Sequence, residues 1–248
     1  MASARRSPDT IAAYMNYIRM LASRVASPAL VVPADLQQLI AEAEAANSAK
    51  VRRAAVRSLF RAAKRAGLVA SDPSADLPVV TIPPSRPRTA SDRHLQQARH
   101  DDPRVDLMIE LGARLGLRRA EIARVKSSDL EPSLLGDVLR VIGKGGRERL
   151  VPCPADLAER IAAVDGWLFP SPHGGPLSPS RVGVLIADAL PGAVTAHWLR
   201  HRYGTRTYRL GGRDIRAVQK LLGHSSVATT QIYTEVEDGD LWAAALAA

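Results

Sequence analysis

Apolar residues recur every three or four positions through the first part of the chain, a spacing that predicts helices. Ser7 followed by Pro8 has the form of a capped helix start. A second helix is predicted over 33–47, beginning at its proline, and a third over 48–67, ending on its glycine. The residues expected inside the third helix are Val51, Ala54, Ala55, Leu59, Phe60 and Ala63.

The pattern changes at the segment TIPPSRPRTAS, which is rich in Pro, Ser and Arg and is typical of an extended linker. We therefore expect an all-helical domain over 1–80, a linker over 81–90 and a second domain over 91–248. The second domain should open with Ser91 as a helix cap. It contains one predicted β-hairpin, in which DVLRVIG and RERLVPC alternate around a Lys-Gly-Gly turn, and its remainder should be helical. The expected fold class is mainly α, with a small antiparallel hairpin or sheet.

Composition narrows the class of protein. Hydrophobic residues make up 46% and charged residues 24%, as in globular proteins. No apolar run approaches the roughly 20 residues that span a bilayer, and the N-terminal residues do not form a secretory signal. The single cysteine, Cys153, leaves neither a disulfide framework nor a zinc cluster. These features favour a cytoplasmic protein of a bacterial cell, without a membrane partner.

The charge indicates the partner. The formal net charge is +9, which favours a polyanion such as nucleic acid. Most of the cations are arginines, whose guanidinium groups bind phosphate oxygens in bidentate fashion, although a GC-rich genome would also raise the Arg count.

The third predicted helix carries a run of cations with few acids to balance it. Such a run is usually a solvated face, but the imbalance favours contact with DNA. The candidate DNA-binding residues are Lys50, Arg52, Arg53, Arg57, Arg61 and Lys64.

Four short segments of the second domain carry candidate chemistry: GLRRAEI, VIGKGGRERLVP, HWLR, and LLGH with a tyrosine nine residues after its histidine. Each has an ordinary explanation when it is taken alone. Arg118 could simply pair with Glu121 at i,i+3, Lys144 could be a solvated turn residue, and Tyr233 could belong to the core.

Taken together and in this order, the segments resemble the catalytic boxes of the tyrosine recombinase, or phage integrase, family. AHWLRHRYGT and LLGHSSVATTQIYTEV match its C-terminal boxes almost residue for residue, and the resemblance covers about residues 88–236. The N-terminal helices are similar, with less specificity, to the family's core-binding domain. No segment resembles the arm-binding domain that many phage integrases carry.

The resemblance implies a role for each site residue. Tyr233 would attack the phosphorus and form a 3′-phosphotyrosine, and Lys144 would protonate the leaving 5′-oxygen. Glu121 would support Arg118. His201 is expected to be structural. The residues expected to bind the phosphate are Arg118, Arg200, His197 and His224.

A covalent route of this kind needs no cofactor, because the phosphotyrosine retains the energy of the broken bond. No carboxylate cluster suits paired Mg²⁺ ions, and no phosphate-binding loop for ATP is present, so we expect neither a metal nor a nucleotide. The expected partners are double-stranded DNA at core recombination sites and other copies of the chain, as a homo-tetramer on DNA and a monomer in solution.

The biological task stays open at this level. Phage or mobile-element integration and excision is favoured, with resolution of chromosome or plasmid dimers as the alternative. A non-catalytic DNA-binding protein of the same fold, and a type IB topoisomerase or telomere resolvase, are further alternatives. The apolar tail residues Leu241, Trp242 and Leu246 are expected to pack into a neighbouring subunit, or else onto their own domain.

Overall fold

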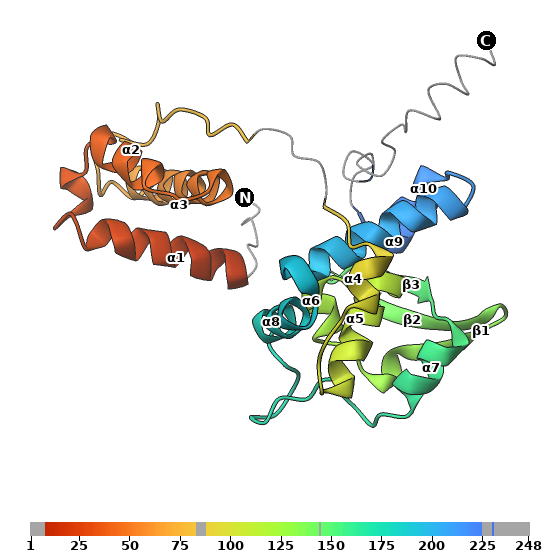
Figure 1. Cartoon of the computed structure of the whole chain (residues 1–248). Helices are drawn as coiled ribbons and strands as arrows, with labels where there is room; N and C mark the ends of the chain where they lie inside the picture. The colour runs from red at the N-terminus through yellow and green to blue at the C-terminus, as the bar shows by residue number, and fades with distance from the viewer. Residues whose placement is uncertain (1–7, 83–87, 144, 225–229, 231–248) are drawn as a thin grey trace, which may run out of the picture. The chain divides into compact units, whose positions relative to one another are not determined.

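The structure, a computed structural model, describes residues 8–82, 88–143, 145–224 and 230 (Figure 1). The chain divides into two compact units, Met1–Ser85 and Arg86–Ala248. Each unit has a hydrophobic core of its own. Within the described ranges, no helix combines the length and the apolar character needed to cross a membrane.

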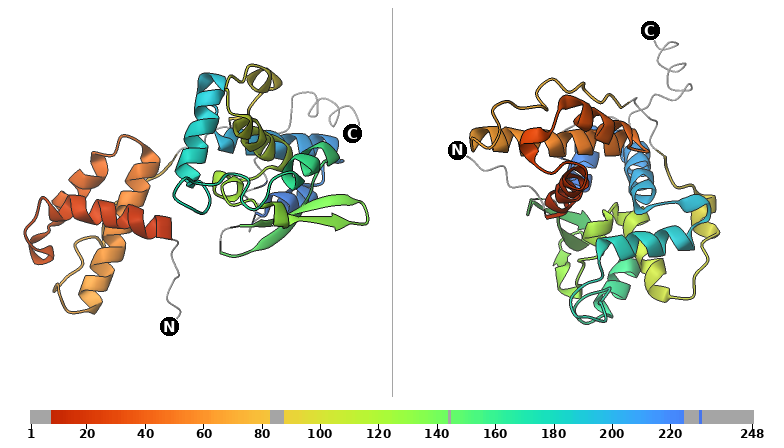
Figure 2. Two further views of the ribbon diagram at one scale, coloured as in Figure 1. Left: turned by 90° about the horizontal axis from the view of Figure 1, so that it is seen from below. Right: turned by 90° about the vertical axis from the view of Figure 1, so that its left-hand side faces the viewer.

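The first unit consists of helices. It contains α1 (Pro8–Ala22), the 3-10 helix η1 (Pro28–Leu30), α2 (Pro33–Ala41) and α3 (Ala46–Arg65), which Figure 2 shows from two further sides. Both α1 and α2 pack against α3. The buried core residues are Leu21, Val31, Leu36, Leu39, Val56, Phe60 and Leu77.

Two predictions for α3 were wrong in detail. The helix begins at Ala46 rather than at Ser48, because the preceding alanine-rich segment has high helix propensity and extends it. Val51 was expected inside, yet it is 37% exposed. At about 3.6 residues per turn, Val51 lies half a turn out of phase with the buried Phe60.

The second unit combines helices with one small sheet. Its helices are α4 (Asp92–Gln96), α5 (Pro103–Leu115), α6 (Arg119–Ile122), α7 (Ala155–Ala162), α8 (Pro179–Ala189), α9 (Ala196–Leu210) and α10 (Ile215–Leu222), with 3-10 helices η2 (Ser127–Asp129) and η3 (Pro191–Ala193). Ser91 caps α4 as predicted, because its hydroxyl accepts from the His94 N–H. The central helix α5 is buried along most of its length and packs on α8 and α9.

The sheet confirms the predicted hairpin and adds a strand to it. β2 (Gly136–Ile142) and β3 (Glu148–Pro152) pair antiparallel, with Leu139 opposite Val151. β1 (Leu130–Ser133) pairs with the other edge of β2, so the expectation that the remainder is helical was wrong. The strand is short and contains a proline, so its sequence carries little strand signal.

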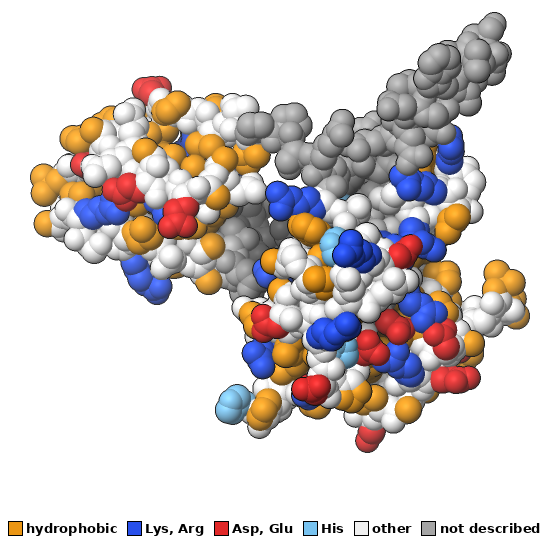
Figure 3. Space-filling view, viewed as in Figure 1, with side chains coloured by type: hydrophobic (Ala, Val, Ile, Leu, Met, Phe, Trp, Pro, Cys, Tyr) orange, Lys and Arg blue, Asp and Glu red, His pale blue; other side chains and the backbone are white. Residues whose placement is uncertain are grey.

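The fold class is confirmed as mainly helical with a small antiparallel sheet. Several segments of the second unit meet near α9. They are the end of α5, the short helix α6, strand β3 and the end of α10. Figure 3 shows Lys and Arg side chains along α9 and α10, whereas both signs of charge are mixed over the rest of this face.

Candidate active site and basic groove

The first candidate segment places Arg118 at a sharp junction between two helices. Gly116 ends α5 with φ 67°, a left-handed conformation that glycine adopts without strain. A side chain there would also collide with the Tyr203 ring, because a Cβ would lie 2.3 Å from Cδ1. Arg118 then forms the N-cap of α6, and its backbone N–H donates to Glu121 Oε2 at 2.8 Å.

Glu121 is a buried carboxylate, with a side chain only 4% exposed. Its Oε1 accepts from Arg118 Nη1 at 2.8 Å, so the i,i+3 ion pair that was the ordinary alternative for these two residues is present. The Arg118 side chain stays 37% exposed. It can therefore reach a bound anion while its Nη1 and its backbone N–H are held by the carboxylate.

A second arginine, Arg149, holds the same carboxylate from strand β3. Its Nη1 donates to Glu121 Oε1 at 3.0 Å and its Nη2 to Oε2 at 2.7 Å. This residue was missed in the sequence, although a signal existed. Side chains alternate along a strand, so a buried Val151 places Arg149 on the same inward face, where a cation requires a partner.

Arg200 on α9 is the most deeply buried of the three arginines, at 2% exposure. Its Nη1 donates to the Gly116 carbonyl and its Nη2 to the Leu222 carbonyl, both at 2.5 Å. Glu121 Oε2 lies 3.8 Å from Nη1. The side chain thus links the end of α5 to the end of α10 beside the Glu121 carboxylate.

Burial acts to raise the pKa of Glu121. The hydrogen bonds and charge of Arg149, together with the backbone N–H and charge of Arg118, outweigh burial and hold the pKa below its ordinary value. The carboxylate is therefore ionised at neutral pH. Three guanidinium groups around one carboxylate leave an excess of positive charge, which suits a phosphodiester.

The histidines of the third and fourth segments lie in the same electrostatic field. Burial lowers the pKa of His197, and the charges of Arg200 and Arg118 lower it further. Burial and the same two charges lower the pKa of His224 to about 4. Both rings are therefore neutral at pH 7 and can donate or accept hydrogen bonds.

Each of these two histidines has a polar neighbour. His197 Nε2 lies 2.8 Å from Nε2 of His201, so one of the two ring nitrogens carries a hydrogen and donates a hydrogen bond to the other. His224 Nδ1 lies 2.9 Å from the hydroxyl of the buried Thr230. His201, expected to be structural, thus contacts a candidate catalytic ring directly.

Buried neutral histidines should make stability depend on pH. Burial, together with the neighbouring His197 and Arg200, lowers the pKa of His201 to about 4 from its ordinary 6.5. The unfolded chain takes up this proton near pH 6.5, whereas the folded chain does so only near pH 4. We expect the free energy of unfolding to fall as the pH drops through this window, and to be insensitive to His201 above it.

Urea unfolding at pH 7.5 and pH 5 would measure this effect. Carboxylates also titrate at acidic pH, so the matched comparison is His201→Gln, which keeps a polar side chain but cannot titrate. Its free energy of unfolding should depend less on pH than that of the wild type. An equal dependence in both proteins would contradict the expectation.

The structure brings together five of the predicted site residues: Arg118, Glu121, His197, Arg200 and His224. Some of the residues singled out in the sequence lie outside the described residues, namely Lys144, Tyr233 and the tail residues Leu241, Trp242 and Leu246. Gly143, which precedes the lysine, lies beside the site, since a Cβ there would be 3.5 Å from Glu121 Oε1. In the described ranges, no three His, Cys, Asp or Glu side chains gather in a way that could hold a metal ion.

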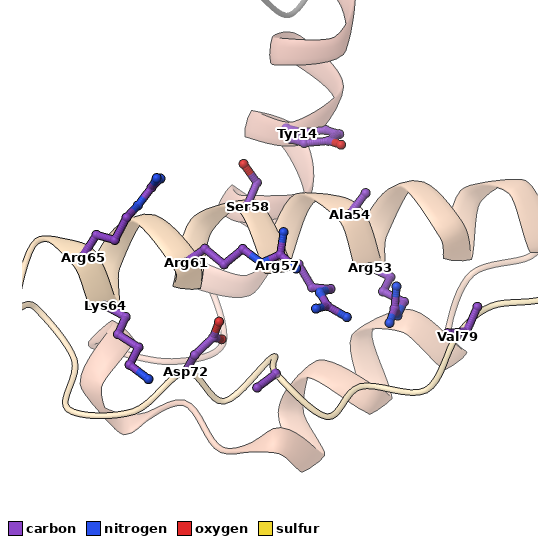
Figure 4. Close-up of a pocket in the computed structure, with 11 residues that line it drawn as sticks. Tyr14, Arg53, Ala54, Arg57, Ser58, Arg61, Lys64, Arg65, Asp72 and Val79 are labelled. Atoms are coloured by element: carbon purple, nitrogen blue, oxygen red, sulfur yellow. The ribbon is translucent and has the colours of Figure 1, made fainter. Parts of the chain in front are cut away.

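The first unit carries a separate basic groove of about 950 Å³ between α1, α3 and the segment after α3 (Figure 4). Its cationic lining comes from α3, with Tyr14 on one side and Asp72 on the other. The lining cations are Arg53, Arg57, Arg61, Lys64 and Arg65.

The predicted DNA-binding residues of α3 differ in their surroundings. Arg61, Lys64 and Lys50 are exposed, whereas Arg57 is half-buried. Arg52 donates to the Leu39 carbonyl at 2.7 Å and lies over the Tyr17 ring. Arg53 donates to the Leu77 carbonyl at 2.9 Å. These two guanidinium groups therefore also stabilise the fold of the unit.

Comparison with known proteins gives consistent matches. The profile of the phage integrase family matches residues 91–239. A tyrosine recombinase XerC of Mesorhizobium japonicum is 33% identical over 96% of this chain and 88% of its own length. A XerC of Methylobacterium sp. is 42% identical over 52% of this chain, but the match spans only 44% of that relative.

A solved structure of similar fold is that of lambda integrase residues 75–356, a dimer bound to a COC′ core site. It has a TM-score of 0.75 and 19% identity, and covers 94% of this chain and 90% of that one.

Proposed function

The chain belongs to the phage integrase family of tyrosine recombinases, and on this premise we propose that it cuts and rejoins double-stranded DNA at specific sites through a covalent bond to Tyr233. One observation carries the proposal. Arg118 and Arg200 lie beside the buried Glu121, and the half-buried rings of His197 and His224 lie in the electrostatic field of both arginines.

In the proposed cleavage step, the Tyr233 oxygen forms a bond to phosphorus and the bond from phosphorus to the 5′-oxygen breaks. The tyrosine proton passes to a neighbouring base, and Lys144 gives a proton to the leaving 5′-oxygen. The products are a 3′-phosphotyrosine and a free 5′-hydroxyl. Rejoining is the reverse attack by a 5′-hydroxyl, which restores the tyrosine and conserves the phosphodiester energy.

The arginines supply charge where the transition state needs it. Negative charge builds on the two non-bridging oxygens, and guanidinium groups held in advance stabilise it without reorganisation. The Arg118 side chain is partly exposed and is held by Glu121, and Arg200 is fixed by two carbonyls. The neutral rings of His197 and His224 would complete the hydrogen bonding to the phosphate.

The proposal is tested by trapping the covalent intermediate. Nicked duplexes carrying candidate sites from beside the gene would release the short strand and prevent rejoining. We expect a protein–DNA adduct that survives denaturation and forms equally well in EDTA, because no step uses a metal. Absence of an adduct on DNA that the protein binds would favour the non-catalytic alternative.

We propose that the basic groove of the first unit holds the DNA backbone. Its cations are concentrated on one helix, and Arg61 and Lys64 are exposed to a ligand. The partner on DNA would be a homo-tetramer, acting on short core sites.

If the groove binds phosphates, affinity should fall steeply with salt, because bound cations displace counterions from DNA. The double variant Arg61→Gln/Lys64→Gln should reduce the slope of log K against log salt by about 1 to 2. Arg24→Gln is the matched control, since Arg24 of the same unit is paired with Glu42 at 2.6 Å. An unchanged slope in the double variant would contradict the proposed DNA face.

The biological task divides into two candidates. One relative that spans nearly the whole chain is named XerC, which fits resolution of chromosome dimers better than the phage or mobile-element integration expected from the sequence. Deletion of the gene in its host distinguishes them. Accumulation of chromosome dimers would support resolution, whereas loss of integration or excision of a neighbouring element would support the other task.

A further inference from the structure

One side chain outside the predicted set, Arg149, joins three segments of the site. Besides its two hydrogen bonds to Glu121, its Nε donates to the Leu221 carbonyl at 2.8 Å. The side chain is 7% exposed. A single guanidinium therefore connects strand β3, the start of α6 and the end of α10.

The contact with Glu121 fixes the orientation of the carboxylate. Arg149 engages both carboxylate oxygens, and each oxygen also accepts from Arg118, Oε1 from Nη1 and Oε2 from the backbone N–H. Rotation of the carboxylate would break several of these bonds at once. Arg149 therefore orients the Glu121 carboxylate, and this carboxylate in turn holds the Arg118 guanidinium in place.

The contact with Leu221 fixes the turn that leads to His224. Gly223 ends α10 with φ 64°, and a Cβ there would lie 3.0 Å from Arg149 Cδ and 3.3 Å from its Nη1. The glycine of the LLGH segment thus permits the close approach of the guanidinium. This gives a physical reason for a glycine immediately before the histidine.

We propose that Arg149 is a positioning residue for DNA cleavage, which orients Arg118 through Glu121 and holds the turn that carries His224. The inference rests on the proposed function. Arg149 touches neither DNA nor a reacting atom in this role.

The experiment compares single-turnover cleavage of the nicked duplex by wild type, Arg149→Met and Arg149→Lys. A misplaced phosphate-binding group should slow cleavage by roughly 10- to 100-fold, with the affinity for DNA within about twofold of wild type. The lysine variant keeps the charge but cannot bind both carboxylate oxygens and the carbonyl together. We expect it to be slow as well, although less so than the methionine variant.

Arg140→Met is the matched control. Arg140 lies on the neighbouring strand β2, and it pairs with Glu131 at 2.9 Å and Asp129 at 3.4 Å, away from Glu121. Its loss removes the same charge from the same sheet. Cleavage by this variant should stay within about twofold of wild type.

Two further readouts separate positioning from a purely structural role. If Arg149 acts through Glu121, the double variant Glu121→Gln/Arg149→Met should be little slower than the slower single variant. In Arg149→Met the buried Glu121 loses its strongest partner, so its pKa rises. Cleavage by that variant should therefore fall on acidification at a higher pH than cleavage by the wild type.

The outcomes are distinct. If wild type forms no adduct, the proposed function fails, whatever the variants do. If wild type forms the adduct and folded Arg149→Lys cleaves at the wild-type rate, the inference about Arg149 is overturned. It is also overturned if the loss of cleavage merely follows the fraction of unfolded protein.

Discussion

Replacing Tyr233 by phenylalanine should abolish covalent capture of DNA altogether. The substitution removes only the hydroxyl oxygen that is proposed to form the bond to phosphorus, and the proposed phosphate-binding residues Arg118 and Arg200 remain. We therefore expect no denaturation-resistant adduct on nicked duplexes under conditions where the wild type forms one. The affinity for the same duplex should stay within about twofold, because binding rests on phosphate contacts elsewhere.

Tyr208 provides the matched control. It is a partly buried tyrosine that packs against Val218 and Leu222, and Tyr208→Phe should leave adduct formation intact. Mapping of the DNA-linked peptide would then identify the attacking residue independently. An adduct in Tyr233→Phe, or a linked peptide without Tyr233, would assign the nucleophile to another residue.

Arg200→Lys should produce the second large effect, on both cleavage and stability. Loss of one preorganised donor to the transition state should slow cleavage by roughly 100- to 1,000-fold. The guanidinium also satisfies the carbonyls of Gly116 and Leu222. A lysine cannot reach both with the same geometry, and an unpaired buried carbonyl costs about 1–3 kcal/mol.

Single-turnover cleavage and urea unfolding would measure the two effects separately. Arg202→Lys is a suitable control, because Arg202 lies on the same helix and forms an ion pair with the exposed Asp92. We expect the control to cleave at close to the wild-type rate and to unfold within about 1 kcal/mol of it. Cleavage by Arg200→Lys within about threefold of wild type would argue against its phosphate-binding role.

Local features of the fold were predictable from the sequence because they depend on neighbouring residues. The cap at Ser91 and the β2–β3 hairpin each follow from hydrogen bonds between residues close in sequence. The start of α3 and strand β1 were missed, because alanine extends a helix without a marked boundary and a short strand with proline has little pattern.

The sequence by itself therefore determined the family, the helical character of the chain and the order of the candidate site residues. Only the tertiary structure decided which partners those residues have. Arg149 donates hydrogen bonds to Glu121, 28 positions away in the sequence, and to Leu221, 72 positions away. Arg200 donates to Gly116, 84 positions away. Similarly, Arg52 and Arg53 share a basic helix with Arg61, but their guanidinium groups bind backbone carbonyls. Contacts of this kind depend on how distant segments pack, and no pattern of neighbouring residues encodes that packing.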